Sequence, residues 1–236
     1  MKRQKENLIY TFLLGAAALF IFSVATFLGI SIFEEYVGIV IGVALMLVAL
    51  LFHNIAKRQI SPYIISYLLN TVACGFSASS YYTAVETHPN LGEFIAATLP
   101  VILLLFICAT VFCFTQTIFN GVLTIFCVLD IALALFAGYN WIAEGDAFWS
   151  FLCFSSIVAL FYIIALKSIA SNSVKFRRKG AFLRIVSFYS FGIFIVVTLI
   201  VLAILSEGDS LDGLDALVLG DTVSGTKDDK KEKKKQ

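Results

Sequence analysis

One acidic residue lies deep inside an apolar stretch of this sequence. Asp130 occupies the middle of the segment 127–132, Cys-Val-Leu-Asp-Ile-Ala. A charge at the centre of a bilayer costs roughly 2.5–3.5 kcal/mol on insertion scales, so such residues usually face a bundle interior or a water-filled cavity. No Lys or Arg lies at similar depth, so burial favours the protonated carboxyl group. Asp130 is therefore a candidate proton or cation site. The alternative is a neutral carboxylic acid that hydrogen-bonds a neighbouring helix and has only a structural role.

A row of polar residues is the second place where chemistry could occur. Its members follow one another at intervals of 4, 4, 3 and 4, which puts them on one helical face: Ser66, Asn70, Cys74, Ser77 and Tyr81. This Ser66–Tyr81 stripe could line an aqueous path for a small solute. It could equally pack against other helices, because Ala73 and Ser77 form a small-xxx-small pair, as do Gly75 and Ser79. Asn70 and Asp130 are both expected near mid-membrane. The sequence leaves open whether they contact each other.

Other signals concern helix packing. Gly38 and Gly42 form a GxxxG pattern, which is common at helix contacts in membranes. Pro100 lies inside another apolar stretch and predicts a kink there. The hinge interpretation and the ordinary-kink interpretation of Pro100 both stay open.

The common catalytic templates are missing from the sequence. It contains no HExxH, GxSxG or phosphate-binding loop, so we expect neither an enzyme nor a bound cofactor. The five cysteines all fall in apolar stretches without histidine partners, which argues against a disulfide framework and a metal site. His53 and His88 are expected at opposite ends of the membrane.

Composition places these residues in a membrane protein. Of 236 residues, 60% are hydrophobic and 14% are charged, and the mean hydropathy is +0.93. A soluble domain averages roughly half apolar and a quarter charged residues. The composition therefore excludes a water-soluble enzyme, a nucleic-acid-binding protein and a disulfide-rich secreted module. The expected partner is the lipid bilayer.

The elements that position these residues are seven predicted membrane-spanning helices. A span needs about 20 mostly apolar residues, and an open strand edge would leave backbone groups unpaired in lipid. The predicted spans are Leu8–Phe33, Tyr36–Phe52, Ile60–Val85, Phe94–Phe114, Ile118–Gly138, Ala147–Leu166 and Ala181–Leu205. The sequence predicts an all-α, polytopic helical bundle over residues 8–205, after a short cytoplasmic segment 1–7.

The distribution of charge predicts the orientation of the bundle. The 17 Lys and Arg residues precede the first span, join spans two and three, surround the link between spans six and seven, or lie in the distal tail. The alternate links carry only acids. The positive-inside rule then puts the N-terminus in the cytoplasm and the C-terminus outside.

The C-terminal segment 206–236 begins acidic and ends rich in Lys, which predicts a solvated, disordered tail. The orientation favours the cell membrane. The final Lys233-Lys234-Lys235-Gln236 fits a dilysine retrieval pattern, which would instead imply the ER membrane and a cytosolic tail.

Together these observations favour a transporter or channel for a small polar or anionic solute or ions. Its path would involve Asp130, Asn70, Ser66, Ser77 and Tyr81. The alternative is a non-transport scaffold or assembly subunit, whose polar stripe makes helix–helix contacts. In either case the sequence leaves open whether the protein forms a homo-oligomer or is a subunit of a larger membrane complex. Anionic lipid head groups are expected at a basic cluster, Lys175, Arg177, Arg178 and Lys179.

Overall fold

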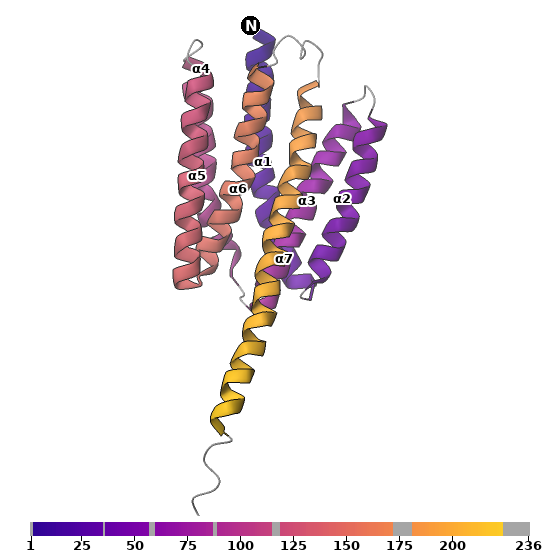
Figure 1. Cartoon of the computed structure of the whole chain (residues 1–236). Helices are drawn as coiled ribbons and strands as arrows, with labels where there is room; N and C mark the ends of the chain where they lie inside the picture. The colour runs from indigo at the N-terminus through magenta and orange to yellow at the C-terminus, as the bar shows by residue number, and fades with distance from the viewer. Residues whose placement is uncertain are drawn as a thin grey trace, which may run out of the picture.

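The chain folds as a bundle of seven α-helices (Figure 1). The computed structural model describes residues 2–34, 36–56, 60–86, 89–114, 119–171 and 181–223, and it contains no strand within those ranges. The helices are α1 (Lys2–Ile32), α2 (Val37–Ile55), α3 (Ser61–Ala84), α4 (Leu91–Phe114), α5 (Phe119–Glu144), α6 (Ala147–Ser171) and α7 (Ala181–Val223). The predicted all-helical class and the number of helices are confirmed.

Successive helices run in opposite directions, so the links alternate between the two ends of the bundle (Figure 1). The N-terminus lies at the same end as the link between α6 and α7, and α7 extends beyond the opposite end. Lys167 and Arg184 flank the α6–α7 link. The opposite end carries acids in every link, among them Glu34, Glu86 and Asp146. The antiparallel arrangement thus separates the basic from the acidic links, as the charge pattern predicts.

Six of the seven helices are long and apolar enough to span a membrane, and α3 does not reach the same apolarity. Helix α3 is instead shielded by its neighbours, since it packs against α1, α2 and α7. Its exposed residues are confined to its first two turns: Ser61, Ile64, Ile65 and Leu68. A helix surrounded by protein can be more polar than one that faces lipid. The chain is thus an integral, multi-pass membrane protein with its most polar helix inside.

Small residues bring α2 and α3 close together. A Cβ atom added to Gly42 would lie 2.6 Å from Ser77 Oγ and 2.9 Å from the Ala73 carbonyl oxygen. Gly38 faces Ser79 and Ser80 of α3 in the same way. The GxxxG pattern and the Ala73–Ser77 pair are therefore both parts of one helix contact.

The other face of α3 packs equally closely against α1. A Cβ atom on Gly75 would lie 2.6 Å from Ala25 Cβ and 2.8 Å from the Phe22 carbonyl oxygen. The second small-xxx-small pair, Gly75 and Ser79, thus belongs to the α1 contact, where Ser79 also faces Gly29.

The remaining helices form a second group, in which α6 packs against α4 and α5. Contacts of α6 and α4 with α1, and of α6 with α7, join the two groups. Stacked and edge-on aromatic rings fill part of this junction: the ring centroids of Phe22 and Phe151 are 5.2 Å apart, and those of Tyr82 and Phe94 are 5.4 Å apart. Tight ring packing of this kind holds the two groups together.

The C-terminal end of α7 differs from the boundary expected from the sequence. Helix α7 continues to Val223, well past the apolar span Phe182–Ser206. The helix therefore includes the acidic part of the segment that the sequence assigned to a tail. The basic cluster expected to contact lipid, Lys175, Arg177, Arg178 and Lys179, lies outside the described residues.

Candidate functional site

The Asp130 side chain points into the protein. It is 0% exposed, whereas its neighbours Val128, Leu129 and Ile131 are all exposed on the outer face of α5. Among the described residues, neither carboxyl oxygen of Asp130 has a hydrogen-bond partner. An acid at the centre of an apolar helix is thus buried by its own chain without a hydrogen bond from the part of the chain that the structure describes.

The position of Asp130 follows from the pairing of α5 with α6. These helices run antiparallel: near one end Lys167 Nζ donates a hydrogen bond to Thr124 Oγ1 at 3.2 Å, and near the other Gly138 lies opposite Cys153. Asp130 lies between these two levels, near the middle of the apolar span Gly121–Glu144. Its carboxyl group therefore lies in the middle of the apolar span, away from both ends of the helix.

This geometry bears on the two interpretations of Asp130. A carboxylic acid that ties helices together must donate or accept a hydrogen bond. Asp130 makes none, and a buried carboxyl group without a partner is unfavourable by several kcal/mol. Unsatisfied buried groups in native proteins commonly mark a functional site or a bound water or ion. The observation favours a proton or cation site over a structural one.

The first half of the Ser66–Tyr81 stripe contacts α7. Ser66 Oγ lies 3.0 Å from Ser187 Oγ, and Asn70 Nδ2 donates a hydrogen bond to Ser190 Oγ at 3.0 Å. His53 of α2 joins the same group, because its Nδ1 lies 2.9 Å from Ser187 Oγ. A polar network thus connects α2, α3 and α7.

The second half of the stripe also lies in helix contacts. Ser77 packs against Gly42 of α2. Tyr81 accepts a hydrogen bond from Trp141 Nε1 of α5 at 2.8 Å, and its ring meets the Trp141 ring edge-on at 5.1 Å. The four polar site residues predicted on α3 are all buried between helices. Their arrangement favours the packing interpretation of the stripe.

Asn70 and Asp130 are not brought together. Asn70 bonds to α7, and its Oδ1 has no hydrogen-bond partner. Asp130 lies on α5, which packs against α6 and α4. Both residues lie near the middle of their helices, but they do not contact each other, because they belong to different helix groups.

A small cavity adjoins the Asn70–Ser190 hydrogen bond. Its volume is about 10 Å³, and its lining comes from four helices: Ala18 and Phe22, Thr71 and Cys74, Val158 and Tyr162, and Ser190 and Ile193. A space of this size is close to the minimum that holds one water molecule. It lies at the junction of the two helix groups, where Thr71, Tyr162 and Ser190 bring polar atoms to an otherwise apolar wall.

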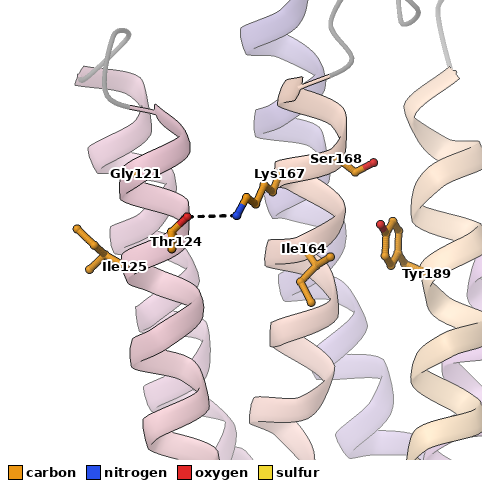
Figure 2. Close-up of a pocket in the computed structure, with 7 residues that line it drawn as sticks. All are labelled: Gly121, Thr124, Ile125, Ile164, Lys167, Ser168 and Tyr189. Carbon is orange, nitrogen blue, oxygen red and sulfur yellow. Dashed lines mark hydrogen bonds between the residues drawn. The ribbon is translucent and has the colours of Figure 1, made fainter.

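A larger, open pocket lies between α5, α6 and α7 at the end of the bundle that carries the N-terminus (Figure 2). Its volume is about 700 Å³. We name it the Lys167 pocket; it is lined by Gly121, Thr124, Ile125, Ile164, Lys167, Ser168 and Tyr189. From the sequence, Lys167 was only one of the basic residues that predict which end of the bundle faces the cytoplasm.

Two residues of the polar network, Ser187 and Ser190, were not singled out from the sequence, and His53 was not linked to them. Ser187 and Ser190 are spaced by three on α7, which puts them on one face, and this spacing is the signal that could have singled them out. His53 could not be linked to them, because the sequence does not tell which helices are neighbours.

Within the described residues, no group of three or more His, Cys, Asp or Glu side chains could hold a metal ion. The second histidine, His88, lies outside those residues. Four cysteines of the described part, Cys74, Cys108, Cys127 and Cys153, are free thiols within helices.

Comparison of the chain with protein-family models, with curated proteins and with solved structures found no match.

Proposed function

We propose that this multi-pass membrane protein moves a small polar or anionic solute, or ions, across the membrane, and that Asp130 binds the coupled proton or cation. The observation that carries the proposal is the Asp130 carboxyl group, which is fully buried with both oxygens unpartnered. No catalytic step is included. We assign the protein to the cell membrane, with its N-terminus in the cytoplasm.

The two helix groups suggest how water would reach Asp130. The group of α4, α5 and α6 meets the group of α1, α2, α3 and α7 through contacts of α4 and α6 with α1 and of α6 with α7. A small displacement of one group against the other would open the junction, as in transporters that expose a midplane site alternately to each side. The described arrangement is then a closed one.

The test replaces Asp130 with Asn in the full chain, reconstituted into liposomes that contain a pH-sensitive dye. Gradients of small carboxylate and inorganic anions are imposed one at a time, and the internal pH is followed. We expect at least one gradient to drive a proton flux in the wild-type protein. Asp130→Asn should abolish the flux and its dependence on pH, because Asn has no ionisable group.

A matched control is Glu144→Gln on the same helix. The Glu144 carboxylate is exposed and accepts a hydrogen bond from Trp149 Nε1, which the Gln carbonyl oxygen can also accept. It should leave the flux unchanged. If Asp130→Asn transports protons as well as the wild type does, the assigned role of Asp130 is wrong.

The second candidate function is a scaffold or assembly subunit. It is favoured by the burial of the four stripe residues in contacts with α2, α5 and α7. On this account neither wild type nor Asp130→Asn carries a flux under any gradient, and Asp130→Asn changes only the mass of the complex isolated from membranes. Native electrophoresis of gently solubilised membranes measures that mass.

A further inference from the structure

The Lys167 pocket presents a cation at the boundary of the bilayer core. Lys167 is the next-to-last residue of the apolar span Ala147–Ser168, and its side chain is exposed. Its ammonium group donates a hydrogen bond to Thr124 Oγ1. An ammonium group has three donors, so two stay available, and no described carboxylate neutralises the charge.

The surroundings of Lys167 combine polar donors with an apolar wall. Figure 2 shows the Lys167 side chain reaching toward Thr124 on α5, while the Tyr189 ring of α7 faces Ser168 and Ile164 of α6. Ile125, on the α5 side, is 59% exposed and therefore faces lipid. The pocket thus offers a charge and hydroxyl groups beside a surface that suits a hydrocarbon chain.

We infer that the Lys167 pocket binds the phosphate group of an anionic phospholipid from the leaflet at this end of the bundle. The phosphate oxygens would accept hydrogen bonds from the ammonium group, and an acyl chain would lie against Ile125 on the same side of α6. Charge-assisted hydrogen bonds to phosphate are stronger than neutral ones, and basic pockets between membrane helices recognise such head groups.

A lipid fits this position better than a free anion for two reasons. The pocket lies where a span ends, which is the depth of lipid phosphates, and it is open rather than enclosed. Its lining also has more apolar than polar surface. A soluble phosphate ion would gain nothing from the apolar part of the pocket.

The test titrates the purified full chain with phosphatidylglycerol and, separately, with phosphatidylcholine, and counts bound lipid by native mass spectrometry. We expect Lys167→Gln to weaken phosphatidylglycerol binding about tenfold, which is typical for loss of a hydrogen bond to a charged group. Lys167→Arg keeps the charge and should bind within about threefold of wild type.

Arg184→Gln is the matched control, because Arg184 is an exposed cation at the same end of α7 and does not line the pocket. It should change the affinity less than about twofold, since a single distant surface charge contributes little. The inference is overturned if Arg184→Gln and Lys167→Gln weaken binding equally. Equal affinity for phosphatidylcholine, or displacement of the lipid by excess inorganic phosphate, would overturn it as well.

Discussion

Two buried polar residues near the middle of their helices behave differently in this protein. Asn70 donates a hydrogen bond to Ser190 across the α3–α7 contact. Asp130 is just as deeply buried and has no hydrogen-bond partner. Hydrogen bonds between membrane helices average only about 0.6 kcal/mol, so one amide contributes modestly to stability. An unpartnered carboxyl group opposes folding and is retained for another reason.

This contrast predicts opposite effects of two similar substitutions. Asp130→Leu should raise the midpoint of thermal unfolding in detergent, because it removes an unpaired polar group whose burial costs about 1–3 kcal/mol. Asn70→Leu has nearly the same change in shape and should lower the midpoint, because it removes the bond to Ser190. A drop for Asp130→Leu as large as that for Asn70→Leu would mean that Asp130 has a stabilising role.

At the scale of elements, the close approach of α2 to α3 depends on glycine. Gly42 leaves room for Ser77 Oγ and the Ala73 carbonyl, either of which would lie within 3 Å of an added Cβ atom. Because a backbone carbonyl cannot turn aside as a flexible side chain can, the two helices would have to separate. The burial of the stripe residues on α3 therefore depends on the small size of neighbouring residues as much as on the polarity of the stripe residues themselves.

The Gly42→Ala substitution tests this contact. We expect it to destabilise the protein by about 1–3 kcal/mol, which is typical of overpacking in a filled interior. Gly138→Ala is the matched control, since its Cβ atom would lie 3.8 Å from Cys153 Sγ, an ordinary contact distance. Unfolding in increasing sodium dodecyl sulfate compares the two. If both alanines have the same effect, the approach of α2 to α3 is not limited by Gly42.

The elements themselves could be predicted from the sequence, and their partners could not. Span length and apolarity are local properties, so all seven helices were found, although α7 continues to Val223, past its predicted end at Leu205. The GxxxG pattern located a true contact. The rotation of α3, which turns Ser66 and Asn70 toward α7, depends on packing between distant parts of the chain. For the same reason Ser187, Ser190 and the Lys167 pocket were not foreseen.

At the scale of the whole molecule, α3 decides how many times the chain crosses the membrane. It is less apolar than the other six helices, yet it runs the length of the bundle among them (Figure 1). Its neighbours α1, α2 and α7 cover most of its surface. We therefore propose seven crossings, with the ends of α3 on opposite sides.

Single cysteines at Gln59 and Asn90, placed in a chain whose own cysteines are replaced by alanine, test this topology. A membrane-impermeant thiol reagent added to intact cells should label Asn90→Cys, whose position is exposed, and leave Gln59→Cys unlabelled until the cells are opened. The reason is that Gln59 precedes α3 next to Lys57 and Arg58, on the predicted cytoplasmic side. Labelling of both positions from the same side would reduce the crossings to six.

We propose that Asp130 exchanges a proton with water although it is buried. Infrared difference spectroscopy measures this exchange without knowledge of the solute. Spectra of the wild type and of Asp130→Asn are compared in lipid nanodiscs across a range of pH and after transfer to heavy water. If Asp130 exchanges a proton with water, we expect a carboxylic acid band that changes with pH and shifts in heavy water. This band should be absent in Asp130→Asn. A wild-type band that neither titrates nor shifts would contradict it.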